Sequence, residues 1–195
     1  HLQAAIENAE SLGFTGGAAL YPMVTMDGRE CHNEWEITFE EIHRNGAMVF
    51  AIYNYIRHTG DWAYLTEGGY EVVIAVARFW AQRVSWSEAK QAFVILGVTG
   101  PNEYENNVNN NWYTNRIAMW CLEYAIEAHQ WLSKNHPNKL KQLHADWAFD
   151  PALEHDRWRA IISDMHYPLL KGTRVFLQQE GYMDKVQMLA DELPE

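Results

Sequence analysis

Apolar side chains recur three or four positions apart along most of this 195-residue chain, a spacing typical of helices. The pattern predicts helices over residues 2–12, 39–58, 71–84 and 113–134, and a weaker one over 153–165. Their predicted inner faces carry Leu2, Ala5, Ile6, Ala9 and Leu12; Ile42, Val49, Phe50, Tyr53 and Ile56; Val73, Val76, Ala77, Trp80 and Val84; and Ile117, Trp120, Cys121, Tyr124, Ala128 and Trp131. Helices therefore dominate the expected fold.

Two long segments, 14–38 and 97–111, lack any period and are rich in turn-forming residues. Loops of this length inside a compact domain are usually functional or disordered. We favour a functional role for 14–38, which carries Tyr21, His32 and Trp35. Each of them precedes a long predicted helix. If the helices form a ring of hairpins, both loops would lie at the same mouth of that ring.

The rest of the chain contains predicted helix ends and short strands. Asp61 and Asp156 are interpreted as helix caps, and Pro137 as a residue just past the end of a helix. Brief apolar runs at 93–96 and 175–177 predict short strands.

The composition narrows the classes of partner. The chain has 26 acidic and 15 basic residues, for a net charge of −11. Without a run of Lys and Arg, neither a nucleic acid nor an anionic membrane is an expected partner. No apolar stretch approaches the ~20 residues of a membrane span, and a cytoplasmic location is the simplest expectation.

Cys31 and Cys121 do not make a disulfide framework. Nine Trp and ten Tyr fit either a core of large side chains or a site where rings stack on sugars.

Two segments resemble a known family. The first runs from Ala19-Leu20-Tyr21-Pro22-Met23 to His32-Asn33-Glu34-Trp35-Glu36 and on to His43, and the second from Gly100-Pro101-Asn102-Glu103-Tyr104 to Asn115. Both are similar to phosphorylases of alpha-linked glucose disaccharides, the family of maltose, trehalose and kojibiose phosphorylases. The combination of the two segments is specific, whereas a Gly-Pro-x-Glu motif alone is weak.

The resemblance implies an all-α fold, part of an (α/α)6 toroid of helical hairpins with short β-hairpin-like segments in its loops. Residues 1–195 would form one piece of a single catalytic domain, without an internal domain boundary. A full toroid needs roughly 300 residues or more. The family's first-glucose segment and its phosphate-binding residues have no equivalent here, so the isolated piece is expected to be inactive.

The activity implied by the resemblance is phosphorolysis of an alpha-linked glucose disaccharide, with inversion, to β-glucose 1-phosphate and glucose. Glu103 would be the general acid. A carboxylic acid can protonate a departing oxygen near neutral pH if burial lifts its pKa from about 4.3 towards about 6–7. Inorganic phosphate would be the co-substrate, with no cofactor and no metal, and the parent enzyme is expected to be a homodimer.

The resemblance also assigns the leaving-sugar pocket to the first loop, and its His-Asn-Glu-Trp-Glu version favours maltose. Trp35 offers a stacking face for a sugar, while His32 and Glu34 offer a donor and an acceptor. A metal held by His32, Glu34 and Glu36 is a disfavoured alternative. The expected substrate-binding residues are His32, Asn33, Glu34, Trp35, Asn102, Tyr104 and Tyr113.

Plainer interpretations stay open beside these. From its residues alone, Glu103 is an ordinary loop acid. Thr38 and Glu41 fit a capping box at the start of a helix, and the Asn-rich stretch 106–111 fits a turn that braces the Glu103 loop. Two rival functions also remain: an inverting hydrolase, with Glu34 or Glu36 as the second carboxylate, and a non-catalytic sugar-binding toroid.

Overall fold

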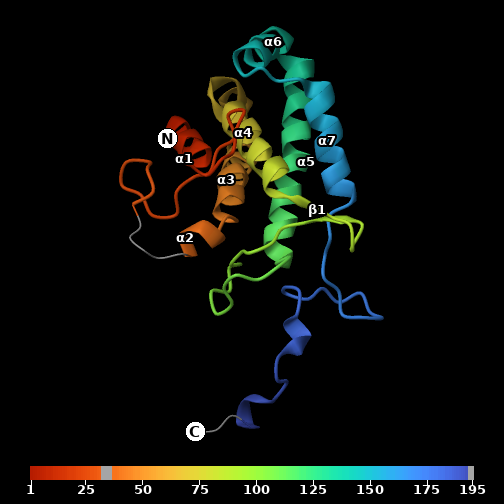
Figure 1. Cartoon of the computed structure of the whole chain (residues 1–195). Coiled ribbons are helices and arrows are strands. Elements are labelled where there is room, and N and C mark those ends of the chain that lie inside the picture. The colour runs from red at the N-terminus through yellow and green to blue at the C-terminus, as the bar shows by residue number, and fades with distance from the viewer. Residues whose placement is uncertain (32–36, 193–195) are drawn as a thin grey trace.

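A computed structural model gives the fold and describes residues 1–31 and 37–192. Its α-helices are α1 (Leu2–Ser11), α2 (Ile37–Glu40), α3 (Arg44–Thr59), α4 (Gly69–Arg83), α5 (Trp112–Asn135), α6 (Pro137–Asp146) and α7 (Pro151–Ser163). The 3-10 helices are η1 (Trp62–Glu67), η2 (Tyr182–Asp184) and η3 (Ala190–Glu192). Figure 1 shows α1, α3, α4, α5 and α7 gathered in one block, from which the C-terminal segment extends. The predicted dominance of helices is confirmed.

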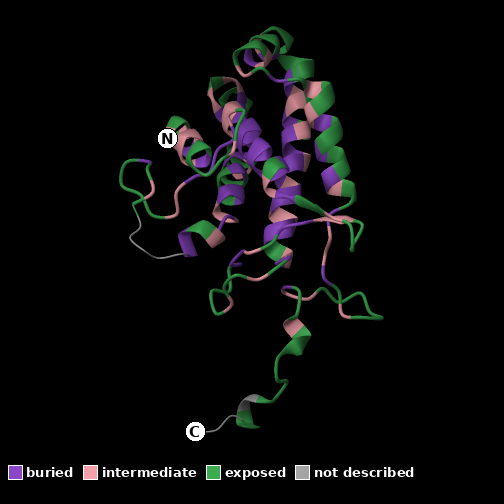
Figure 2. Cartoon of the chain, viewed as in Figure 1, coloured by how far each residue is buried: buried purple, intermediate pink, exposed green. Residues whose placement is uncertain are grey.

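Helix α4 is the centre of the block. It packs against α3 and α5, and α1 and α7 also contact it. Ile74 and Phe79 are as fully buried as Val73 and Trp80 of the predicted stripe, so this helix has no wide solvent face. Figure 2 shows the buried positions concentrated on α4 and on the faces of α3 and α5 that flank it. Each such aliphatic or aromatic side chain contributes about 1.5–3 kcal/mol when fully buried.

The predicted helix over 39–58 is in fact two helices. Helix α2 ends at Glu40 and α3 begins at Arg44. The capping box is wrong, because Thr38 lies inside α2 and the Glu41 amide donates to the Ile37 carbonyl oxygen at 2.9 Å. Phe50, placed on the inner face by its spacing, is 48% exposed.

Three further predictions about helix ends need correction. The Asp61 side chain makes no cap bond and instead accepts a hydrogen bond from the Tyr55 hydroxyl at 2.7 Å. Asp156 lies within α7 and pairs with Arg159 on the surface, whereas Asp150 caps that helix through the amides of residues 152 and 153. Pro137 does follow α5, but it is also the first residue of α6, a helix that the apolar pattern did not predict.

The strand predictions are half right. Strand β2 (Ala92–Val94) overlaps the predicted run at 93–96 and pairs antiparallel with β1 (Ser85–Ser87), which was not predicted. The run at 175–177 forms only an isolated bridge between Leu169 and Phe176. Within the described residues, both cysteines are free thiols, and no helix there is long and apolar enough to cross a membrane.

Helix α2 follows the first long loop along the chain and contacts the second. The first begins beside α4, where the Ala19 amide donates to the Ala75 carbonyl oxygen. It then leads to α2, and Glu40 of α2 contacts the second loop at Thr99. Helix α2 lies above the 97–111 loop in Figure 1, and the common mouth of the two long loops stays a prediction.

Candidate active site

Glu103 stands at the tip of the 97–111 loop. The loop is closed at its base by an antiparallel bridge between Val98 and Val108, whose amides exchange hydrogen bonds of 2.9 and 2.8 Å with the opposite carbonyls. At the tip, Pro101, Asn102, Glu103 and Tyr104 line an open hollow of about 440 Å³. The side chain of Glu103 is exposed, so this chain alone does not bury the carboxyl as a general acid requires.

Glu40 fastens both sides of this loop to α2. One oxygen of its carboxylate, Oε2, accepts hydrogen bonds of 2.6 Å from the Thr99 hydroxyl and from the Asn107 amide. The backbone carbonyl of Glu40 also accepts from the Thr99 amide at 3.2 Å. Because Thr99 and Asn107 lie on opposite sides of the tip, the position of Glu103 depends on the end of α2.

Glu41 and His43 are titratable groups beside Glu103. Burial is the main cause that raises the pKa of Glu41, and the charge and hydrogen bond of Glu103 add to it, against the charge of Arg44. Burial lowers the pKa of His43, although its Nδ1 lies 3.3 Å from the Thr99 carbonyl oxygen. Both shifts favour the uncharged side chain. Glu41 is therefore harder to ionise than an ordinary carboxyl, and His43 is harder to protonate than an ordinary imidazole.

The opposite side of the loop is held by the C-terminal segment. Asn102 Nδ2 donates to Gln178 Oε1 at 3.2 Å, and the backbone amide of Trp112 donates to the Gln178 carbonyl oxygen at 2.8 Å. Asn110 Nδ2 donates to Glu180 Oε2 at 2.8 Å. Residues 178–180 thus join the tip of the loop to its exit and to the start of α5.

The Asn-rich stretch behaves as the predicted brace. Its side-chain oxygens accept hydrogen bonds from backbone amides on either side of the loop, which satisfies groups that no helix or strand pairs. The bonds run from Gly97 to Asn109 (3.1 Å), from Ile95 to Asn110 (3.2 Å) and from Thr114 to Asn111 (3.0 Å), the last being the N-cap of α5.

The structure describes only some of the other predicted site residues. Tyr113 is 42% exposed and meets the His43 ring edge-on, with centroids 5.6 Å apart. Tyr104 is 97% exposed. The predicted residues His32, Asn33, Glu34 and Trp35 lie outside the described residues, as does Glu36. Within the residues that are described, no cluster of three or more His, Cys, Asp or Glu side chains could hold a metal ion.

Residues 1–193 match the glycosyl hydrolase family 65 central catalytic domain. The chain belongs to this family. It is 53% identical over 192 residues to the maltose phosphorylase of Bacillus subtilis (strain 168), covering 98% of the chain and 24% of that protein. It is 33% identical over 195 residues to an alpha,alpha-trehalose phosphorylase of Thermoanaerobacter brockii, covering 100% of the chain and 25% of that protein. The chain thus spans about a quarter of the length of these relatives.

A solved structure shares the fold of this family 65 chain. It belongs to a protein assigned as a kojibiose phosphorylase from the human microbiome, with a TM-score of 0.81 and 24% identity. The match covers 94% of the chain and 24% of that structure. The predicted all-α class is confirmed, and the helices form part of an (α/α)6 barrel, the fold of family 65.

Sequence reasoning missed the residues that hold the family 65 loop in place. Glu41 was interpreted as part of a capping box, and Glu40, whose carboxylate holds the loop, was given no role. Gln178 gave no local signal, because its side-chain partner Asn102 lies 76 positions earlier in the chain.

Proposed function

We propose that this chain is part of the catalytic domain of an inverting phosphorylase of an alpha-linked glucose disaccharide. Maltose is the first candidate, because the maltose phosphorylase relative shares 53% of the aligned residues. The observation that carries the proposal is the position of Glu103 on a loop fastened from two sides, facing an open hollow. A carboxyl held in this way can reach a bound sugar.

In the proposed reaction, Glu103 gives its proton to the oxygen that links the two glucoses. The bond from this oxygen to the anomeric carbon breaks, and its electron pair stays on the departing glucose. A phosphate oxygen attacks the anomeric carbon from the opposite face, which inverts its configuration. The phosphate releases its proton to solvent as its oxygen bonds to the anomeric carbon, and the Glu103 carboxylate regains a proton from solvent, so that the acid is regenerated.

Phosphorolysis and hydrolysis differ in their need for a second carboxylate. An inverting hydrolase needs one about 6.5–9.5 Å from the acid, so that a water molecule fits between them. Glu34 and Glu36, the candidates for that role, lie outside the described residues. Phosphate needs no such base, because it is already an anionic nucleophile.

Several accompanying features belong to the same proposal. The sugar pocket would be formed by His32, Asn33, Glu34 and Trp35 together with Asn102, Tyr104 and Tyr113. The 195 residues would form one piece of a single domain, phosphate would be the co-substrate without a cofactor, and the longer enzyme would be a cytoplasmic homodimer.

The test uses the full-length enzyme that contains this chain. Maltose cleavage is followed with and without phosphate, and β-glucose 1-phosphate is detected by NMR. We expect cleavage only with phosphate, and a loss of about 10²–10⁴-fold in kcat for Glu103→Gln, since the amide cannot supply a proton. Glu88→Gln, on the exposed β1–β2 turn, is the matched control and should leave the rate unchanged. Equal rates with and without phosphate, or an active Glu103→Gln enzyme, contradict the proposal.

A further inference from the structure

Glu40 joins the two sides of the 97–111 loop around the acid that the loop carries. Thr99 lies four positions before Glu103, and Asn107 lies four positions after it. A single atom, Oε2 of Glu40, accepts a 2.6 Å hydrogen bond from the Thr99 hydroxyl and another from the Asn107 backbone amide. Short bonds to a charged acceptor are about twice as strong as bonds between neutral groups. One carboxylate oxygen therefore ties together the two segments that lead to and from Glu103.

Both donors depend on this oxygen. Thr99 is fully buried, and a buried hydroxyl is costly without a partner. A second acceptor, Asn106 Oδ1, lies 3.4 Å from that hydroxyl, which makes a much weaker bond. Asn107 has a φ of 51°, in the left-handed region that side chains rarely adopt. The bond from its amide to Glu40 helps to hold the backbone in this conformation.

Glu40 itself stands on a firm base, because it lies between buried neighbours at the end of α2. Ile37 and Ile42 are 4% and 2% exposed. The Glu40 carbonyl oxygen accepts from the Thr99 amide at 3.2 Å, and His43 Nδ1 lies 3.3 Å from the Thr99 carbonyl oxygen. The amide, hydroxyl and carbonyl of Thr99 thus all contact residues 40–43, so the loop is attached to the helical block as well as to itself.

The other contacts of the loop act at its base and at its tip. The antiparallel bridge closes the base through backbone bonds, which do not by themselves set the angle between the loop and the helices. At the tip, Asn102 donates to Gln178, and Glu105 pairs with Lys185 of the C-terminal segment. Glu40 acts between these two levels and links both sides of the loop to α2.

We propose that Glu40 is the positioning residue of the general acid. By tying Thr99 and Asn107 to the end of α2, its carboxylate directs the Glu103 side chain to the hollow at the tip of the loop. A proton passes efficiently only over a distance of about 2.6–3.2 Å, and a displacement of about 1 Å can slow a reaction by about 10²-fold. Glu40 forms no bond with the sugar in this role. The inference rests on the proposed function, since it concerns the acid of that reaction.

The experiment compares two substrates in the full-length enzyme, each with phosphate. For maltose, Glu40→Ala should lower kcat by about 10–100-fold. The KM for maltose should stay within about two-fold, because the substitution removes no contact with the sugar. For α-glucosyl fluoride, kcat should change little, because fluoride leaves with little help from an acid. A role limited to the stability of the fold would slow both substrates alike.

Two further variants separate hydrogen bonding from general stability. Glu40→Gln keeps an oxygen that can accept both bonds, so it should recover most of the rate that Glu40→Ala loses. Asp150→Ala is the matched control, because Asp150 Oδ1 also accepts two bonds, from the amides of Ala152 and Leu153 at 3.0 and 3.1 Å. The start of α7, which it caps, lies at the other end of the block from the 97–111 loop in Figure 1. Asp150→Ala should lower the unfolding temperature and leave kcat for maltose unchanged.

Thr99→Val tests the same contact if Glu40→Ala does not fold. Val keeps the shape of the side chain and the backbone bond to Glu40 but removes the hydroxyl. We expect a several-fold loss of kcat for maltose and an unchanged kcat for the fluoride. An equal loss for the two substrates, an unchanged rate for maltose in Glu40→Ala, or no recovery in Glu40→Gln overturns the inference.

The outcomes also separate this inference from the proposed function. An enzyme that cleaves maltose without phosphate, or one that stays active in Glu103→Gln, contradicts the proposed function. An enzyme that needs both phosphate and Glu103, but whose Glu40 and Thr99 variants affect the two substrates alike, overturns only the positioning role of Glu40.

Discussion

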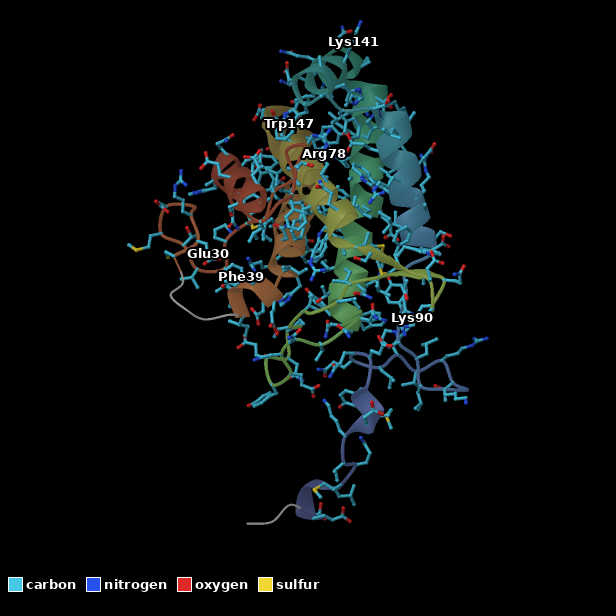
Figure 3. All side chains as sticks on the ribbon, in the orientation of Figure 1. Glu30, Phe39, Arg78, Lys90, Lys141 and Trp147 are labelled. Atoms are coloured by element: carbon cyan, nitrogen blue, oxygen red, sulfur yellow. The ribbon has the colours of Figure 1, made fainter. Side chains whose placement is uncertain are left out.

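Arg78 is a buried residue of α4 that joins three parts of the chain, and its removal should strongly destabilise the fold. From the middle of α4 it donates Nε and Nη2 to the two carboxylate oxygens of Glu154, at 2.9 and 2.6 Å. Its Nη1 donates to the carbonyl oxygens of Gly16 at 2.7 Å and Trp147 at 3.1 Å. Figure 3 shows Arg78 and Trp147 close together on the block.

The magnitude follows from burial. The side chains of Arg78 and Glu154 are 10% and 19% exposed, so solvent screens the pair weakly. Each of these hydrogen bonds to a charged group contributes about 1.5–3 kcal/mol, but bonds that share one side chain do not add. Breaking a buried pair by removing one partner costs about 3–5 kcal/mol. We therefore expect Arg78→Ala to lower the free energy of unfolding by about 3–5 kcal/mol.

Urea unfolding, followed by tryptophan fluorescence, measures this change. Arg78→Lys is the informative control, because Lys keeps the charge but loses the planar fork that binds Glu154 through two bonds. Its loss should be clearly smaller than that of Arg78→Ala. In a cycle with Glu154→Gln, the double variant should be less destabilised than the sum of the single ones. A loss below about 1 kcal/mol for Arg78→Ala would mean that the pair behaves like an exposed one, and the reasoning from burial would be wrong.

Two other predictions concern the 97–111 loop and the helical block. A methyl group added at Gly100 would overlap the side-chain amide of Asn111. Gly100→Ala should therefore displace the cap of α5, which lowers the free energy of unfolding by about 1–2 kcal/mol, and should reduce kcat. An unchanged kcat would show that the loop adapts to the methyl group. Burial, with the charges of His155 and His144, lowers the pKa of His129 to about 4, whereas the unfolded value is about 6.5. The unfolded chain therefore binds more protons below about pH 6.5, and stability present above that pH is lost as the pH falls towards 4. Urea midpoints at about pH 7.5 and 5 should show this loss, and His129→Phe should reduce it; an equal loss in the variant would assign it to other groups.

Helices with a regular apolar period were predictable from the sequence. Helix starts and ends that are set by one residue, such as Pro137 or Glu40, were not. Helices α4 and α5 begin and end within two residues of their predicted bounds, because burial dictates their composition. Helix α6 was missed because Pro137 was interpreted only as the end of one helix, whereas proline also suits the first turn of the next. The break after Glu40 has no local marker and follows from the bonds that Glu40 makes with Thr99 and Asn107.

The candidate site was predictable as a motif but not as an arrangement. The resemblance selected Glu103 and its neighbours from the Gly100-to-Tyr104 segment, and the Asn-rich stretch gave its brace through ordinary turn chemistry. The effect of the Glu103 charge on the pKa of Glu41 was not predictable from sequence, because 62 positions that include α3 and α4 separate the two residues. The exposure of Glu103 was also not predicted.

The loop that carries Glu103 is held by residues from distant parts of the chain. Glu40 precedes Asn107 by 67 positions, and Gln178 follows Asn102 by 76. Bringing such remote segments together costs chain entropy before any contact forms, whereas the cap of α5 joins residues only three positions apart. The helices can thus form early as local units. The Glu103 loop is fixed only when the polypeptide has closed on it from both directions, and we expect this corner to be the last to assemble.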